Sequence, residues 1–82
     1  MNMNSLIIKY PISLVTYGLN GHITHITKDF INLATHSTYL YINNQALCGD
    51  PYYGYHKLLT IILENGEHFE FKEGSYLLVQ II

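Results

Sequence analysis

The sequence lacks arginine and tryptophan, and it contains only one cysteine and two prolines. The single cysteine, Cys48, excludes an internal disulfide and leaves no thiolate cluster for structural zinc. Four lysines stand against six acidic residues, which gives a formal net charge of −2 at pH 7. A nucleic-acid-binding protein needs a basic face to neutralise phosphates, so this composition argues against that class.

Long hydrophobic runs are also missing. One long uncharged stretch, residues 10–27, contains Pro11, two glycines and two histidines, which argues against a transmembrane helix there. Residues 1–5 carry no positive charge, and the apolar run that follows them stops at Lys9, so a secretory signal is not expected. We therefore expect a cytoplasmic protein with no membrane span, in which the lone thiol stays reduced.

Hydrophobic residues account for 49% of the 82 residues and charged residues for 12%, a composition typical of globular rather than disordered chains. This length predicts a single domain, residues 1–82, which buries only ~60–65% of the surface that its unfolded chain exposes. We expect its free energy of unfolding to be a few kcal/mol.

Glycine and proline divide the chain into short segments rich in β-forming residues. The turn at residues 18–21 predicts a hairpin between 13–17 and 22–26, and Asn65-Gly66 between two apolar runs predicts another. The strands are expected at residues 6–10, 12–17, 22–26, 38–43, 56–63, 67–71 and 75–82.

One short helix is predicted at residues 27–34, with Thr27 as its N-cap. Phe30, Ile31 and Ala34 follow at spacings that place them on one helical face. No further helical patterns alternate with the strands, so a parallel βαβ sheet is not expected. The pattern predicts an all-β fold with one short helix, a small antiparallel β-sandwich or barrel of six to seven strands.

Several short motifs occur in order along the chain. They are Tyr17-Gly18, Ile26-Thr27 with Phe30, Ile42-Asn43-Asn44, Gly49-Asp50-Pro51, Gly54, Lys57-Leu58, Ile61, Glu73-Gly74, Leu77 and Val79. In this order they resemble the C-terminal domain of DnaJ homologue subfamily C member eleven, a family that also occurs free-standing in microbes and fungi. The resembling run, Ile23–Ile82, together with the Tyr17-Gly18 motif before it, covers about four fifths of the chain. It implies a small, mostly-β module without catalytic residues, and the absence of a His-Pro-Asp tripeptide gives no support for a J-domain.

The histidines offer a metal site that their spacing does not favour. His22 and His25 are three residues apart on an expected strand, so their side chains point to opposite faces and cannot share a metal without a bulge. Residues that could complete a site in space are His36, His56, Asp29 and Asp50. We interpret the histidines as separate surface or half-buried residues, and we expect no metal and no cofactor.

Cys48 could act as a nucleophile with His56, eight residues further on. No basic neighbour or helix N-terminus follows the cysteine to lower the pKa of its thiol, and no oxyanion hole is visible. We interpret Cys48 as a small buried residue and expect no catalytic residues. Asn43, Asn44 and Asp50 could offer oxygens to calcium, but they lack a dense pattern of acids, and an Asx-type turn is the preferred interpretation.

A tyrosine-rich loop is the most suggestive candidate for binding. Tyr52, Tyr53 and Tyr55 place three aromatic rings within four positions, close to Gly49 and Gly54. Tyrosine is enriched at interfaces, where one end of the side chain is dry and the other wet. Such a loop could grip a protein partner, lock two copies together or stack on a sugar. The alternative is a self-packed loop that covers an open end of the sandwich.

The segments 58–63 and 75–82 carry apolar side chains on both faces. Each is either a central strand buried on both sides or an edge strand that pairs with another chain. Two such strands are more than a lone two-layer domain of this size buries easily. The pattern therefore predicts a homo-oligomer or burial against a partner.

The leading hypothesis is a non-enzymatic module that self-associates or docks on a protein. Its anchors would be Tyr52, Tyr53 and Tyr55, with Asp50 and Lys57 holding the loop. The alternative is a lectin-like, carbohydrate-binding domain in which the same tyrosines stack on a sugar. In that case Asn43, Asn44 and Asp50 would bind its hydroxyls.

Overall fold

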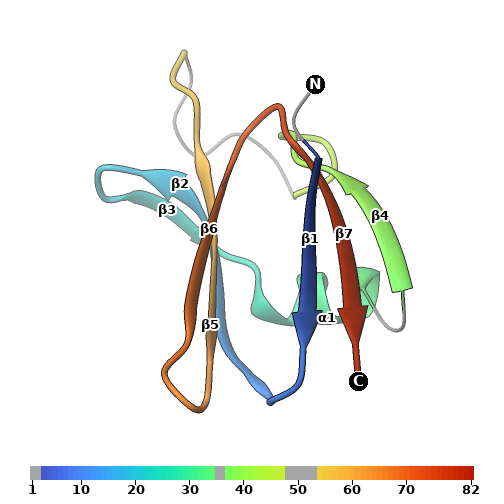
Figure 1. Cartoon of the computed structure of the whole chain (residues 1–82). Helices are drawn as coiled ribbons and strands as arrows, with labels where there is room; N and C mark the ends of the chain where they lie inside the picture. The colour runs from blue at the N-terminus through green and yellow to red at the C-terminus, as the bar shows by residue number, and fades with distance from the viewer. Residues whose placement is uncertain (1–2, 35–36, 48–53) are drawn as a thin grey trace.

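The computed structural model describes residues 3–34, 37–47 and 54–82, and in this part of the chain the predicted all-β sandwich with one short helix is confirmed (Figure 1). One sheet has three strands in the order β1-β7-β4, and the other has four in the order β3-β2-β5-β6. The elements are β1 (Met3–Ile8), β2 (Ile12–Leu19), β3 (His22–His25), α1 (Thr27–Leu33), β4 (Ser37–Tyr41), β5 (Leu58–Leu63), β6 (His68–Lys72) and β7 (Tyr76–Ile81). Helix α1 connects β3 of one sheet to β4 of the other at the lower end of Figure 1.

The core lies between the two sheets and follows the period of two that strands impose on side chains. On β5, Leu59, Ile61 and Leu63 are buried, whereas the residues between them are only half-buried. The core cluster joins residues of both sheets, of α1 and of the segments beside them, namely Leu6, Ile8, Val15, Tyr17, Ile26, Phe30, Ala34, Leu40, Ile42, Leu47, Leu59, Ile61, Leu63, Leu77 and Val79. This cluster is what holds the two layers together.

The two strands that are apolar on both faces are central strands, as one of the two interpretations expected. β5 lies between β2 and β6, and β7 lies between β1 and β4. Burial on both sides is wrong, however, because buried side chains alternate with half-buried ones along β5 and along β7 as far as Val79. The half-buried apolar residues Leu58, Ile62, Tyr76 and Leu78 therefore lie on the outer faces of the sheets.

One strand pairing departs from the antiparallel prediction. β1 runs parallel to β7, with Met3 opposite Tyr76 and Ile8 opposite Ile81, whereas the other four pairings are antiparallel. Antiparallel neighbours are favoured where a tight turn joins two strands. β1 and β7 are the first and last strands of the chain, so no turn joins them and nothing local imposes an antiparallel direction.

The hairpin between β2 and β3 has a shorter turn than predicted. Leu19 pairs with His22, and the two residues between them, Asn20 and Gly21, have φ angles of 51° and 85°. Positive φ at both central residues is typical of a type I′ turn, which suits the twist of a hairpin. Gly18 was predicted to be part of this turn, but it is a buried residue of β2 that pairs with Ile23.

The start of α1 also differs from the prediction. Ile26, not Thr27, is the N-cap residue, and no side chain caps the helix. The Oγ1 atom of Thr27 instead accepts a hydrogen bond of 2.9 Å from the backbone N–H of Val15 on β2. The Ile26 N–H donates to the Val15 carbonyl at 2.9 Å, so the helix start is fixed to the sheet rather than to itself.

The buried side of α1 contains two of the three predicted residues. Phe30 and Ala34 are each 1% exposed, and Ile26, one helical turn before Phe30, is also buried. Ile31 is 41% exposed, so its assignment to the buried face is wrong. A spacing of four, rather than one of three, decides which side chains of this two-turn helix reach the core.

Candidate functional site

Lys57, predicted to hold the tyrosine-rich loop, is a buried residue. Its side chain is 3% exposed, and its Nζ lies 3.7 Å from Oε1 of Glu73. The same Oε1 atom accepts a hydrogen bond of 2.9 Å from the Lys57 backbone N–H, and the Glu73 N–H donates to the Lys57 carbonyl at 2.9 Å. This double link joins the start of β5 to the β6–β7 connection, and it was not predicted from the sequence.

The two asparagines proposed as ligand-binding residues already accept hydrogen bonds within the chain. Oδ1 of Asn43 accepts one of 2.7 Å from the Ala46 N–H, and the Leu47 N–H donates to the Asn43 carbonyl at 3.1 Å. In this Asx-type geometry the side chain of Asn43 stabilises its own turn. Oδ1 of Asn44 accepts a hydrogen bond of 2.9 Å from the hydroxyl of Tyr17.

Three of the predicted binding residues do lie near one another. Asn44, Tyr55 and Lys57 line a shallow hollow of about 220 Å³, together with Gly54, His56 and Glu73. The predictions for His36, Cys48, Asp50, Tyr52 and Tyr53 lie outside the described residues. The hollow gathers residues of the start of β5 and the β6–β7 connection, but two of its polar groups, the Asn44 amide oxygen and Glu73 Oε1, are engaged within the fold.

The Tyr17 hydroxyl is a fully buried donor, and its removal makes a clear test of this packing. We expect Tyr17→Phe to lower the free energy of unfolding by about 1–2 kcal/mol, because it leaves the Asn44 oxygen without this donor. The midpoint of thermal unfolding would fall by roughly 4–16 °C. Tyr10→Phe is the matched control, since Tyr10 is an exposed residue. Equal midpoints for the two variants would show that the buried hydroxyl contributes nothing to the stability of the fold.

The histidines of the described chain do not gather into a metal site. His22 and His25 are exposed on β3, an edge strand, and His56 is exposed near the start of β5. His68 lies on β6, with its Nε2 3.6 Å from Oε2 of Glu70. Within residues 3–34, 37–47 and 54–82, no three side chains of His, Cys, Asp or Glu are placed to hold a metal ion.

The outer face of the three-stranded sheet carries a group of apolar and aromatic side chains, here called the tyrosine face. Its members alternate with core residues along β1, β7 and β4, and they are Met3, Ile7, Tyr39, Tyr41, Tyr76 and Leu78. Met3 and Tyr41 flank Tyr76 in one row, and Ser5 and Tyr39 flank Leu78 in the next. The ring of Tyr76 lies 4.7 Å from that of Tyr41 and 5.5 Å from that of Tyr39, between ring centroids.

The tyrosine face is exposed and free of charge. Met3, Ile7, Tyr39 and Tyr41 are each between 42% and 57% exposed, although they are large and mainly apolar. None of the three strands contains a charged residue. The outer face of the four-stranded sheet is different, because His68, Glu70 and Lys72 project from its edge strand β6. Scattered exposed apolar residues are ordinary, but a contiguous uncharged set on one face is typical of an interaction surface.

Sequence reasoning missed the tyrosine face because its members come from three separate segments. The signal present in the sequence is the alternation Tyr39-Leu40-Tyr41, which places both tyrosines on one side of β4. The pairing that brings Tyr76 between them joins residues 35 or more positions apart. No local sequence pattern indicates that these side chains become neighbours.

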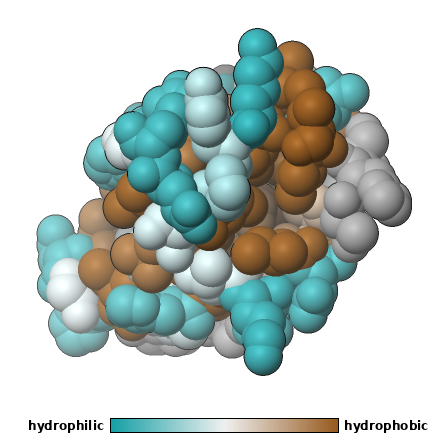
Figure 2. Space-filling view, turned by 90° about the horizontal axis from the view of Figure 1, so that it is seen from below, coloured by the Kyte–Doolittle hydropathy of each residue, from teal (hydrophilic) through white to brown (hydrophobic). Residues whose placement is uncertain are grey.

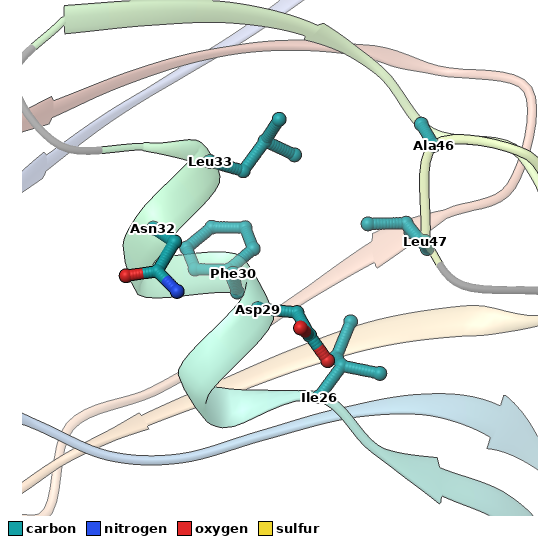
Figure 3. Close-up of a pocket in the computed structure, with 7 residues that line it drawn as sticks. All are labelled: Ile26, Asp29, Phe30, Asn32, Leu33, Ala46 and Leu47. Carbon is teal, nitrogen blue, oxygen red and sulfur yellow. The ribbon is translucent and has the colours of Figure 1, made fainter.

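A pocket of about 370 Å³ lies between α1 and the turn at residues 43–47 (Figure 3). Figure 3 shows Leu33 and Leu47 extending into the space between these two elements, with the ring of Phe30 on the helix beside it. The remaining lining residues are Ile26, Asp29, Asn32 and Ala46. Asp29 supplies the one carboxylate among the lining residues, so the pocket is apolar with a single acidic group at its rim.

An apolar groove of about 370 Å³ lies at the lower end of the sandwich. Figure 2 looks at this end of the molecule and shows apolar side chains gathered between hydrophilic ones. The lining residues are Ile8, Lys9, Tyr10, Pro11, Ile12, Ile31, Ile81 and Ile82. Lys9 is the one charged residue among them. Nothing in the lining selects one class of ligand over another.

Comparisons with family models, with curated proteins and with solved structures give no match. The resemblance to the C-terminal domain of DnaJ homologue subfamily C member eleven therefore stays a prediction. Among the described residues, no helix is long and apolar enough to cross a membrane.

Proposed function

We propose that the protein is a non-enzymatic interaction module that self-associates through the tyrosine face. The observation that supports this proposal is an exposed, uncharged and contiguous apolar surface on three neighbouring strands. Large rings with hydroxyl tips give contact area at a small loss of side-chain freedom, which is why tyrosine is frequent among the residues that dominate binding.

A second copy of the chain is the occupant that this surface fits. Two copies carry the same net charge of −2, so they repel weakly, and contact is best made where no charge has to be desolvated. The tyrosine face meets this condition because β1, β4 and β7 contain no charged residue. A face of three strands measures roughly 15 by 20 Å. Two such faces have a projected area of roughly 600 Å² in total, which is small for a stable interface, so we expect a weak dimer.

Sedimentation equilibrium of the full chain over about 1–100 µM tests the proposal. We expect a dimer or larger assembly, and we expect the double variant Tyr39→Lys/Tyr41→Lys to raise its dissociation constant at least about tenfold. Ile23→Lys is the matched control, since Ile23 is 47% exposed on an edge strand of the other sheet. It adds the same kind of charge away from the tyrosine face.

Three other outcomes would overturn the proposal. A monomer at every concentration would exclude self-association. An equal effect of Ile23→Lys would place the contact on the other sheet. Alanine substitution of Tyr52, Tyr53 and Tyr55 could abolish association while the Tyr39/Tyr41 variant has no effect. That result would place the contact at the tyrosine-rich loop.

A further inference from the structure

We propose that two copies of the chain join edge to edge through β1, with the two β1 strands antiparallel about a two-fold axis at Ser5. The two three-stranded sheets would then form one continuous six-stranded sheet. This inference rests on the proposed self-association and adds a second contact, made by backbone groups rather than by the tyrosine face.

The backbone of β1 has one side paired and one side open. The carbonyl of Ile8 accepts a hydrogen bond of 3.0 Å from the Ile82 N–H. The N–H and C=O of Ile8 therefore point toward β7. Backbone groups of successive residues in a strand point to opposite sides, so those of Leu6 and Asn4 also face β7. The groups of Met3, Ser5 and Ile7 therefore point away from the sheet. No hydrogen bond found in the described residues engages them.

This open edge lacks the features that usually prevent strands from pairing. β1 runs for six residues without a charge, a proline or a register shift. β6, an edge of the other sheet, has exposed His68, Glu70 and Lys72, and β3, the opposite edge, is only four residues long. Unprotected strand edges are templates for a further strand. β1 is therefore better suited than β3 or β6 to accept another chain.

The sequence of β1 is compatible with its own antiparallel copy. With a two-fold axis at Ser5, Ser5 faces its counterpart, and Met3 of each copy faces Ile7 of the other. The residues with outward backbone groups are these same three, so each of these three opposed pairs is a hydrogen-bonded pair, and together they give about six backbone hydrogen bonds. Ser5 is small and exposed, and no like charges meet. The outer faces of both copies lie on the same side, so the two tyrosine faces become one wider surface.

Amide hydrogen exchange followed by NMR tests this arrangement on the unmodified chain. We expect the Ser5 and Ile7 amides to be protected from exchange at high protein concentration. On dilution, their exchange rates are expected to rise at least about tenfold. The Leu6 and Ile8 amides, which donate to β7, would stay protected at both concentrations. Association without this alternating pattern would overturn the edge contact and leave the proposed function intact, whereas a monomer throughout would overturn both.

Ser5→Pro provides an independent test. Proline removes the outward N–H of Ser5, and proline is tolerated at an edge whose N–H faces solvent, so the sandwich is expected to fold. We expect this variant to lose edge pairing and to keep association through the tyrosine face. The Tyr39→Lys/Tyr41→Lys variant is expected to keep edge pairing and to lose association through the tyrosine face. If Ser5→Pro does not fold, the exchange pattern of the unmodified chain decides whether the edge contact forms. A folded Ser5→Pro variant that keeps full association and the same exchange protection at Ile7 would contradict the edge contact.

Discussion

Replacing Gly18 by alanine is expected to lower the free energy of unfolding by about 3 kcal/mol and the midpoint of thermal unfolding by roughly 12–24 °C. Gly18 pairs with Ile23 across the β2–β3 hairpin. A Cβ atom at this position would lie 2.1 Å from the His22 carbonyl oxygen and 2.7 Å from the Ile23 Cα. Both are backbone atoms, so no side-chain rotation relieves the clash, and β3 has to move away from β2.

Gly66→Ala is the control for the Gly18 variant. Gly66 has a φ of 94° and open space around its Cα, so alanine there meets conformational strain but no clash. We expect it to cost about 1–2 kcal/mol, because an L-residue is strained at positive φ. Thermal unfolding followed by circular dichroism gives both values. If Gly18→Ala were no more harmful than Gly66→Ala, the close approach of β3 to β2 would be wrong.

The second large effect is expected at the buried ion pair of Lys57 and Glu73. Glu73→Ala removes the carboxylate from a lysine that is 3% exposed and also removes the acceptor of the Lys57 N–H. A buried charge that loses an opposite charge is strongly destabilising, and we expect a loss of about 2–3 kcal/mol in the free energy of unfolding. Denaturant unfolding monitored by tyrosine fluorescence provides the measurement.

Two variants separate the charge from the hydrogen bond at this site. Glu73→Gln keeps an acceptor and removes the charge, so we expect it to fall between the native protein and Glu73→Ala. Glu67→Ala is the surface control, because Glu67 hydrogen-bonds Asn65 on an exposed turn. Loss of an exposed contact of this kind is expected to cost less than about 0.5 kcal/mol. Equal effects of Glu73→Ala and Glu67→Ala would show that burial adds nothing to the Lys57–Glu73 contact.

The position of Lys57 bears on the interpretation of the tyrosine-rich loop. A lysine held at the start of β5 by Glu73 stabilises the junction between β5 and the β6–β7 connection. In the described residues it thus has a structural partner rather than a ligand. We propose that a partner instead binds to the outside of the β1-β7-β4 sheet, where Tyr39 and Tyr41 are exposed.

The tyrosine face and the β1 edge belong to the same sheet, and this has a consequence for assembly. Edge pairing places two tyrosine faces side by side, whereas face packing covers them. The two-fold axis of the edge contact is perpendicular to the sheet, whereas that of the face contact is parallel to the sheet and lies between the two packed faces. Two isologous contacts of this kind are compatible within one closed assembly. Each variant described above would then reduce the assembly without abolishing the other contact.

The sequence by itself determined most of the local structure. Alternating side chains located the strands to within a few residues, and Asn65-Gly66 marked the β5–β6 hairpin correctly. The short helix at 27–33 was also predicted, although its N-cap and the exposure of Ile31 were not. These features depend on residues close together in the chain, so a window of a few positions contains the information that specifies them.

Only the tertiary structure decided which distant segments became neighbours. The parallel pairing of β1 with β7, the contact of Lys57 with Glu73 and the row that joins Met3, Tyr76 and Tyr41 all connect residues far apart in sequence. Gly18 was read as a turn residue because glycine is common in turns, whereas its role is to let two strands approach closely. Such contacts follow from how the two sheets pack around one core, which depends on the whole chain at once. The candidate surface could be identified only after that packing had set the strand order.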